Sequence, residues 1–336
     1  MRGDLSMLKY EDIKKIAILF DKKAVVFDIT QDELNTLQQA FPDARICLKK
    51  NQDDLILEMP DADAIFVFPG ITADRYIKQD KNLKWVHSLI AGVDFIAIPE
   101  VIDNDDIVLT NTSGIHGKPI SEYVVAMILG KLKSLSYMEK QQKKHIWMQP
   151  WLEEIEGKTV AVLGVGNIGK EIARKCKVLG FRVLGYKRSF EELDYVDQIF
   201  TDPSELPGLL SQSDFVVSTM PASPQTNKMI GRAQFEQMKK GAYFINVGRG
   251  ATVDTYALIW ALQNGQISGC SLDAVDPEPL PGDSPLWDLQ NCIITPHTSA
   301  SSPLYTKRAF EKIAVIAADL KNGRSITNLV DKSQYK

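Results

Sequence analysis

Three residues that could perform acid–base or ionic chemistry each follow a run typical of a buried strand. Arg249 follows the apolar run 243–247 between two glycines, which are expected to free it from crowding. Glu278 lies in a Pro-rich loop after 269–273, and His297 ends the segment 292–297. Ligands of an open parallel α/β sheet bind beyond the carboxyl ends of its strands, so we expect these side chains on one face. Hydride transfer to a carbonyl leaves negative charge on oxygen, which needs a cation and a proton donor. The set therefore suits carbonyl reduction.

Each of these residues also has a simpler interpretation. Arg249 could be a surface arginine in a turn, and any one acid of 273–278 could serve the turn alone. Among the other histidines, His87 is expected to be a satisfied core or surface residue, and His145 to be solvated. His116 could contact a ligand, but its position before a helix favours a capping or surface role.

A glycine-rich turn follows the apolar strand 159–163. In Gly164-Val165-Gly166-Asn167-Ile168-Gly169, the first glycine permits a tight turn, the second lets a pyrophosphate approach, and the third lets the next helix pack closely. That helix is expected at 170–179, and its N-terminus would offer N–H groups to a diphosphate. The order of strand, turn, helix and strand predicts a dinucleotide site; the alternatives are a structural glycine turn or a methyltransferase.

The elements that must position these residues alternate along the chain. Strands are expected at 16–20, 44–48, 64–68, 84–88, 107–110, 159–163, 181–186, 215–218, 243–247, 269–273 and 292–295, and helices at 31–40, 119–142, 170–179, 254–264 and 303–322.

This alternation predicts an α/β protein with two doubly wound domains. A Rossmann dinucleotide-binding domain, residues 113–297, is inserted into a flavodoxin-like substrate domain, residues 1–112 and 298–336. Two chain crossings would form a hinge, and small ligands commonly bind at domain interfaces.

Composition excludes several classes of function. The 336 residues are 44% hydrophobic and 24% charged, with a net charge of -4 and no basic patch that would suit nucleic acid. No apolar run approaches the ~20 residues of a membrane span, and the first residues lack the apolar core of a signal peptide. The four cysteines show no metal-ligand spacing, which favours buried free thiols, no metal site and a cytoplasmic location.

These motifs together resemble the D-isomer-specific 2-hydroxyacid dehydrogenases, which include glyoxylate/hydroxypyruvate reductases, phosphoglycerate dehydrogenases and D-lactate dehydrogenases. The resemblance covers about Phe68 to Leu329. It rests on the segments 89–94, 111–114, 164–169, 246–250, 273–279 and 295–297.

The resemblance implies a role for each catalytic residue. Arg249 would hold the substrate carboxylate and polarise the 2-keto oxygen, and His297 would donate the proton to that oxygen. Glu278 would hydrogen-bond His297, and a neighbouring carboxylate favours the charged imidazolium. Asp273 would contact the nicotinamide carboxamide.

The same resemblance implies the binding residues. The backbone of Ala91, Gly92 and Val93 would bind the substrate carboxylate from the first domain, so that closure assembles the site. The cofactor would contact Gly164, Gly166, Asn167, Ile168, Gly169, Thr219, Pro221 and Val247. The segment Thr219-Met220-Pro221 departs from the His or Asn that many relatives have there, which leaves the shape of the pocket open.

The end of the second Rossmann strand predicts the cofactor. An Asp or Glu about 20 residues beyond the glycines normally binds the ribose 2′-hydroxyl and selects NAD. Lys187, Arg188 and Ser189 stand there instead, and no carboxylate appears until Glu191. Two cations and a hydroxyl would bind a 2′-phosphate, so NADPH is expected rather than NADH. The alternative is that Lys187 and Arg188 belong to a solvated charged turn and do not bind the cofactor.

The expected activity is reduction of a small 2-keto acid, of the glyoxylate/hydroxypyruvate/pyruvate class, to the D-2-hydroxy acid. The alternative is a nucleotide-sensing binding protein on the same scaffold, like the corepressors that share these motifs. A homodimer through 119–158 is suggested by the resemblance and by Trp147 and Trp151. Trp287 could reach the site of the other subunit or be an ordinary core residue.

Overall fold

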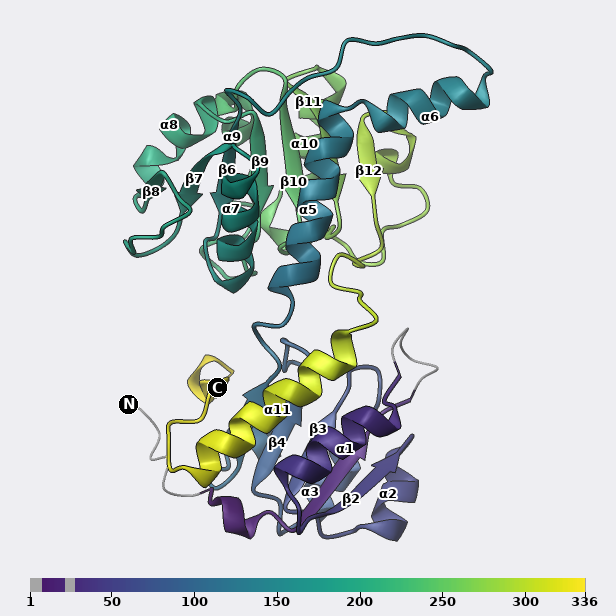
Figure 1. Cartoon of the computed structure of the whole chain (residues 1–336), viewed down its shortest axis with the longest axis vertical. Coiled ribbons are helices and arrows are strands. Elements are labelled where there is room, and N and C mark those ends of the chain that lie inside the picture. Colours follow the sequence, from purple (N-terminus) through teal and green to yellow (C-terminus); the bar gives the residue numbers. More distant parts are fainter. Residues whose placement is uncertain (1–7, 22–27, 336) are drawn as a thin grey trace. The chain divides into compact units, whose positions relative to one another are not determined.

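The computed structural model describes residues 8–21 and 28–335, so the polar N-terminal stretch with Met7 lies outside the described part. The chain divides into two compact units (Figure 1). The first unit comprises 1–115 and 301–336, and the second comprises 116–300. Each crossing therefore lies three residues later than the boundaries 112/113 and 297/298 expected from the sequence.

The first unit is a five-stranded parallel sheet in the order β2-β1-β3-β4-β5. Its strands are β1 (Lys15–Leu19), β2 (Arg45–Lys49), β3 (Ala64–Val67), β4 (Trp85–Ser88) and β5 (Val108–Asn111). Helices α1 (Gln31–Ala40) and α11 (Tyr305–Lys321) pack on one face; α2 (Gln52–Glu58), α3 (Asp74–Gln79) and α4 (Pro99–Ile102) pack on the other. Successive strand side chains point to opposite faces, so strands covered on both sides must be apolar throughout.

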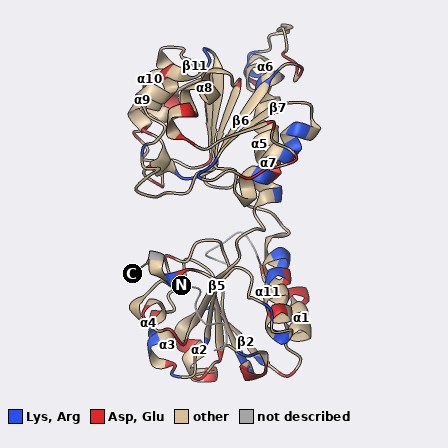
Figure 2. Ribbon diagram, turned by 90° about the vertical axis from the view of Figure 1, so that its left-hand side faces the viewer, with Lys and Arg blue, Asp and Glu red and all other residues tan. Residues whose placement is uncertain are grey.

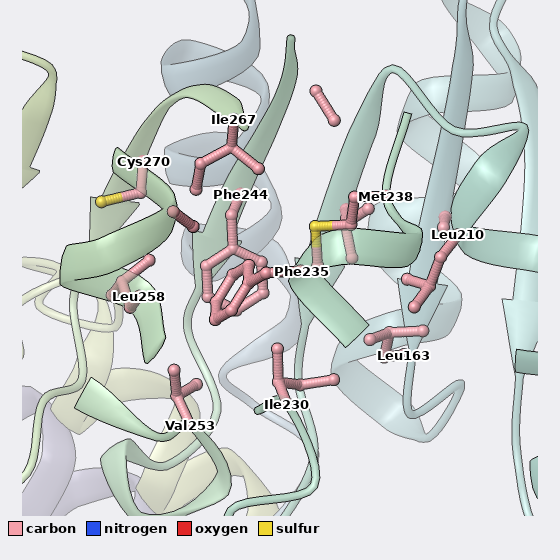
Figure 3. Close-up of a cluster of buried hydrophobic side chains, with 14 of the residues drawn as sticks. Leu163, Leu210, Ile230, Phe235, Met238, Phe244, Val253, Leu258, Ile267 and Cys270 are labelled. Carbon is pink, nitrogen blue, oxygen red and sulfur yellow. The ribbon is translucent and has the colours of Figure 1, made fainter. Parts of the chain in front are cut away.

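The second unit is a seven-stranded parallel sheet in the order β12-β11-β10-β9-β6-β7-β8. Its strands are β6 (Thr159–Leu163), β7 (Arg182–Tyr186), β8 (Gln198–Phe200), β9 (Phe215–Ser218), β10 (Ala242–Asn246), β11 (Ile267–Leu272) and β12 (Cys292–Ile294). Helices α5 (Gly117–Leu132) and α7 (Asn167–Val178) pack on one face, and α8 (Leu206–Ser211), α9 (Arg232–Gln237) and α10 (Thr255–Gln263) on the other. On that second face Phe235 and Phe244 pack edge to face, with ring centroids 5.6 Å apart (Figure 3). The two sheet orders confirm the doubly wound α/β class.

Short 3-10 helices complete the described chain, at Tyr10–Asp12, Pro203–Glu205, Gly250–Thr252, Pro285–Asp288 and Lys332–Gln334.

The structure differs from the expected elements at the helix 119–142 and at the strand β8. The helix expected over 119–142 is two helices, α5 and α6 (Leu135–Lys143), because Ser134 adopts a left-handed conformation with φ of 51°. Helix α5 has a buried face, whereas α6 buries no residue. The two helices therefore share no continuous packed face that would keep them collinear. Strand β8 was not expected, because three residues at a sheet edge give too short a pattern.

His87 is a satisfied core histidine, as one of its two interpretations predicted. It is fully buried, and its Nδ1 and Nε2 lie 2.7 and 3.0 Å from the hydroxyls of Thr110 and Thr112. Burial lowers the pKa of His87 from 6.5 to about 3, because the charged ring would lose its hydration.

This shift predicts an acid-sensitive fold. The unfolded chain binds a proton at His87 near pH 6.5 and the folded chain only near pH 3, so stability contributed by neutral His87 falls as pH drops through that window. The slope is up to about 1.4 kcal/mol per pH unit for one group. Urea unfolding of the native protein and of His87→Gln, compared between pH 7 and pH 4.5, should show a smaller loss of stability in the variant. Equal losses would contradict the assignment.

Three of the four cysteines, Cys47, Cys176 and Cys270, are buried free thiols, as expected, and Cys292 is half-buried. Cys270 and Cys292 face each other on β11 and β12, with sulfurs 3.3 Å apart. Within the described part of the chain, no group of three His, Cys, Asp or Glu residues lies together as a metal site would require. In the same part, no helix is both long and apolar enough to cross a membrane.

Candidate active site

The glycine-rich turn of the second unit joins β6 to α7. Gly164 has a φ of +96°, and a Cβ on Gly169 would lie 2.3 Å from the Gly164 carbonyl oxygen, so the helix can approach the strand only with glycine there. Gly166 caps α7 with no side-chain hydrogen bond, and a Cβ on it would meet nothing within 4 Å. The open backbone at the start of a 12-residue helix fits a dinucleotide diphosphate.

Thr219, one of the expected cofactor residues, holds this turn in place. Its hydroxyl donates to the carbonyl oxygen of Gly164. Pro221, two residues on, is exposed, and Val247 at the end of β10 is buried. The structure thus places Thr219 against the glycine-rich turn itself, where it fixes the backbone that a cofactor would meet.

Arg249 follows β10 between two glycines, for a reason that differs from the one expected. The sequence suggested that these glycines free Arg249 from crowding. In the structure a Cβ on Gly248 would lie 2.6 Å from the Met220 carbonyl oxygen, and one on Gly250 would lie 1.9 Å from that of Val275. The glycines let the loops after β9 and β11 pack against the Arg249 loop. The Arg249 side chain is exposed, and its Nη1 donates to the Gly248 oxygen at 2.9 Å.

His297 and Glu278 lie together at the ends of β12 and β11. Nδ1 of His297 is 3.0 Å from Oε2 of Glu278, and Oε1 of Glu278 accepts from the Val275 N–H at 3.0 Å. His297 has a φ of 53°, and its side chain is 50% exposed. With Nδ1 directed to the carboxylate, Nε2 is the ring nitrogen left to exchange a proton with another molecule.

Asp273 holds the segment that carries His297. Its Oδ1 accepts from the Thr295 hydroxyl at 2.6 Å and from the Thr298 N–H at 2.8 Å, and its Oδ2 accepts from the Ser299 N–H at 3.0 Å. The side chain is buried. This geometry gives Asp273 a positioning role that sequence reasoning missed; its contact with a nicotinamide carboxamide stays a prediction.

The sequence also did not reveal the positioning roles of Tyr123 and Asn246. Tyr123 on α5 lies 2.9 Å from the Thr295 hydroxyl, and Asn246 donates to the Ala274 oxygen at 3.1 Å. His116 is the N-cap residue of α5, which is one of the two roles expected for it, but it is half-buried and makes no side-chain cap bond. Burial and the charge of Arg249 lower the pKa of His116 to about 4. A hydroxyl, an amide or a histidine in a loop carries no pattern that reveals such partners.

In the first unit, the loop after β4 has each of four successive carbonyls held by a hydrogen bond. The oxygens of residues 89–92 accept, in order, from the Tyr305 hydroxyl at 3.2 Å, the Thr112 N–H at 3.0 Å, the Asn111 amide at 2.8 Å and the Ser88 hydroxyl at 2.6 Å. Fixing the carbonyls fixes the peptide planes. The N–H groups of Ala91, Gly92 and Val93 are thereby held in set directions, as a backbone anion site requires.

The buried Tyr305 hydroxyl provides a test of this loop. The Tyr305 hydroxyl holds the peptide plane between Leu89 and Ile90, which precedes the three planes that carry the Ala91, Gly92 and Val93 N–H groups. Tyr305→Phe should raise the KM for an anionic substrate about three- to tenfold, because the start of the loop loses its support, while kcat and the KM for the cofactor stay unchanged. Tyr76→Phe is the matched control, since the buried Tyr76 hydroxyl likewise donates to a carbonyl, that of Met59 at 2.6 Å. Steady-state kinetics of the two variants should differ in KM alone; the same KM for both would refute the role of Tyr305.

The residues expected to select the cofactor follow β7. Arg188 and Ser189 are exposed, whereas the Lys187 side chain is only 17% exposed and forms an ion pair with Glu191. Glu191 also accepts from Lys170 on α7 at 2.6 Å. These two lysines lower the pKa of Glu191 to about 2, since both stabilise its charge. The sequence predicted the cations Lys187 and Arg188, but it did not predict that the carboxylate of Glu191 pairs with Lys187.

A seven-stranded parallel sheet with a glycine-rich β6–α7 turn, together with His, Glu and Arg at the carboxyl ends of its strands, defines the class of nicotinamide-dependent dehydrogenases. The family model for the NAD-binding domain of D-isomer-specific 2-hydroxyacid dehydrogenases matches residues 125–299. The chain belongs to this family of NAD(P)-dependent D-2-hydroxyacid dehydrogenases.

Three relatives show how far the similarity extends. A glyoxylate reductase of Thermofilum pendens is 31% identical over 296 residues, 85% of this chain and 86% of that one. A D-3-phosphoglycerate dehydrogenase of Archaeoglobus fulgidus is 30% identical over 92% of this chain, which spans only 59% of that protein. A D-isomer-specific 2-hydroxyacid dehydrogenase of Xanthobacter autotrophicus Py2, solved with NADPH and MES, is 28% identical with a TM-score of 0.80, covering 96% and 100% of the two chains. These relatives give no support to a corepressor-like role.

Proposed function

We propose that the protein reduces a small 2-keto acid of the glyoxylate/hydroxypyruvate/pyruvate class to the D-2-hydroxy acid, with NADPH as the reductant. The single observation that supports the reaction best is the His297–Glu278 pair, 3.0 Å apart at the ends of two adjacent strands. The glyoxylate reductase of Thermofilum pendens supports the substrate class.

The bound nicotinamide would supply a hydride to the carbonyl carbon. The proton for the carbonyl oxygen comes from Nε2 of His297, because Nδ1 is directed to Glu278. Glu278 keeps the imidazole oriented through its hydrogen bond with Nδ1. Arg249 binds the keto acid with its planar fork and stabilises charge on the oxygen. The N–H groups of Ala91, Gly92 and Val93 bind a carboxylate.

Arg249→Lys tests this use of the guanidinium. A lysine keeps the charge but cannot form two parallel hydrogen bonds, so KM for the keto acid should rise and kcat fall, together about 10- to 10²-fold in kcat/KM. Arg232→Lys, on the surface of α9, is the control. Steady-state kinetics that leave Arg249→Lys equal to the native enzyme would place Arg249 outside the site.

NADPH is proposed because Lys187, Arg188 and Ser189 occupy the end of β7, where an acid would select NAD. The Xanthobacter autotrophicus relative, whose structure contains NADPH, supports this preference. Gly164, Gly166, Asn167, Ile168, Gly169, Thr219, Pro221, Val247 and Asp273 are the further proposed cofactor contacts.

The experiment that tests the proposal follows oxidation of NADPH with a panel of 2-keto acids, together with aldehydes and ketones that lack the carboxylate. We expect turnover only with the acids, and most efficiently with the small ones. Turnover with aldehydes alone, or with none of the compounds, would reject the proposed substrate class.

We propose further that the protein is a cytoplasmic homodimer. Trp147 and Trp151 are 96% and 100% exposed, beside the exposed Ile146, Met148 and Leu152. Contiguous apolar surface of this kind marks protein–protein contact. A mass in solution of twice the chain would support the dimer, and a single-chain mass would contradict it.

A further inference from the structure

Helix α7 carries Lys170, Arg174, Lys175 and Lys177, and blue segments mark Lys and Arg along its ribbon in Figure 2. Lys170 differs from the other three in its partner. Arg174, Lys175 and Lys177 pair with Glu171, Glu122 and Asp197, whereas Lys170 shares the carboxylate of Glu191 with Lys187.

The shared carboxylate marks a point where two ammonium groups converge. Glu191 Oε1 accepts from Lys170 at 2.6 Å, and Oε2 accepts from Lys187. Lys170 lies in the first turns of α7, which follows the glycine-rich turn, and Lys187 follows β7, whose Tyr186 oxygen accepts from the Gly164 N–H at 2.8 Å. Two elements in contact with this turn therefore deliver their cations to one anion. A phosphate is a larger anion that suits the same pair of donors.

Glu191 also belongs to the segment that would meet the 2′-phosphate. It lies four residues after Lys187 and is exposed, with no other partner than the two lysines among the contacts of the described residues. With Lys170, Lys187 and Arg188 the local charge is +3, and Glu191 reduces it to +2. An ionised carboxylate repels a phosphate placed beside it. If the carboxylate moves away instead, breaking its ion pairs with the two lysines costs free energy.

We infer that Glu191 is an internal competitor for the 2′-phosphate site: its carboxylate occupies the lysines that would bind that phosphate, and so it limits selectivity for NADPH. The inference rests on the proposed NADPH preference and adds to it a residue that acts in the opposite direction. Glu191 is thus a specificity-determining residue whose removal strengthens binding of the phosphorylated nucleotide only.

The test measures binding of 2′-AMP and 5′-AMP by calorimetry to the native protein and to Glu191→Gln, with no turnover required. Because the group is exposed, we expect about a two- to fivefold lower Kd for 2′-AMP in the variant, on the order of one exposed ion-pair contribution, and an unchanged Kd for 5′-AMP. The gain should shrink in high salt. The KM for NADPH should fall in parallel and that for NADH should not change. Glu236→Gln, which breaks the exposed pair with Arg232 on α9, is the matched control.

The outcomes separate this inference from the proposed function. If the native protein binds 2′-AMP better than 5′-AMP but Glu191→Gln binds 2′-AMP equally or more weakly, Glu191 organises the lysines and the inference is overturned while the NADPH preference stands. If the native protein has no preference for 2′-AMP and the variant gains none, both are overturned. If Glu191→Gln tightens both nucleotides equally, the effect is general attraction and the inference also fails.

Discussion

His297→Ala should lower turnover with a 2-keto acid by ~10²–10⁴-fold, the range for a lost general acid, while affinity for the cofactor stays nearly unchanged. The reason is that Nε2 of His297 is the proton donor of the proposed reaction, held by Glu278 at 3.0 Å. Because His297 is half-exposed, the variant should fold normally.

Two measurements make this result specific. Pre-steady-state or steady-state turnover gives the loss, and fluorescence titration with the reduced nucleotide gives the affinity. His145→Ala is the control, since His145 is exposed. Native turnover in His297→Ala would remove His297 from the reaction; lost nucleotide binding would indicate damage to the fold instead.

The second large effect concerns the cofactor. Lys187→Asp combined with Arg188→Ala should lower the ratio of kcat/KM for NADPH to that for NADH by about 10²–10³-fold, because two charge-assisted contacts to the 2′-phosphate are lost and a repulsive carboxylate is added. The kcat itself should change little, since these residues are not at the reacting atoms.

The matched control places the same change of charge elsewhere: Lys240→Asp with Lys239→Ala, at the N-terminal end of β10, away from the carboxyl ends of the strands. It should leave the ratio unaltered. If the native protein prefers NADH, or if the double variant at 187 and 188 keeps the native ratio, the interpretation of the β7 end is wrong.

The parts of the fold that depend on residues close together in the chain could be predicted from the sequence, whereas the parts that depend on distant residues could not. The two α/β sheets follow from apolar runs and from the glycine spacing, since both report local geometry. Helix α1 was predicted at 31–40 and is confirmed at Gln31–Ala40, because a helical period is local too. The break at Ser134 and the short β8 were missed because no proline or glycine marks the first and three residues carry little pattern in the second.

The same distinction between local and long-range interactions applies to the candidate active site. The positions of Arg249, Glu278 and His297 at strand ends could be read along the chain. The partners of Asp273, which lie 22 to 26 residues away, could not. Nor could the contact between Glu191 and Lys187, although it spans only four residues, because no helix fixes that spacing and the loop must close back on β7. Gly248 and Gly250 were noticed, but their reason, the close approach of neighbouring loops, is a tertiary fact.

We propose direct hydride transfer from NADPH to the 2-carbon of a small 2-keto acid. Incubating the protein in ordinary water with glyoxylate or pyruvate and NADPH that carries deuterium at both C4 positions of the nicotinamide tests this transfer. We predict that the 2-hydroxy acid carries one deuterium on C2, and that the product from pyruvate is the D isomer. A product with only solvent hydrogen on C2, an L product, or bound NADPH that is not oxidised by any 2-keto acid would contradict the account.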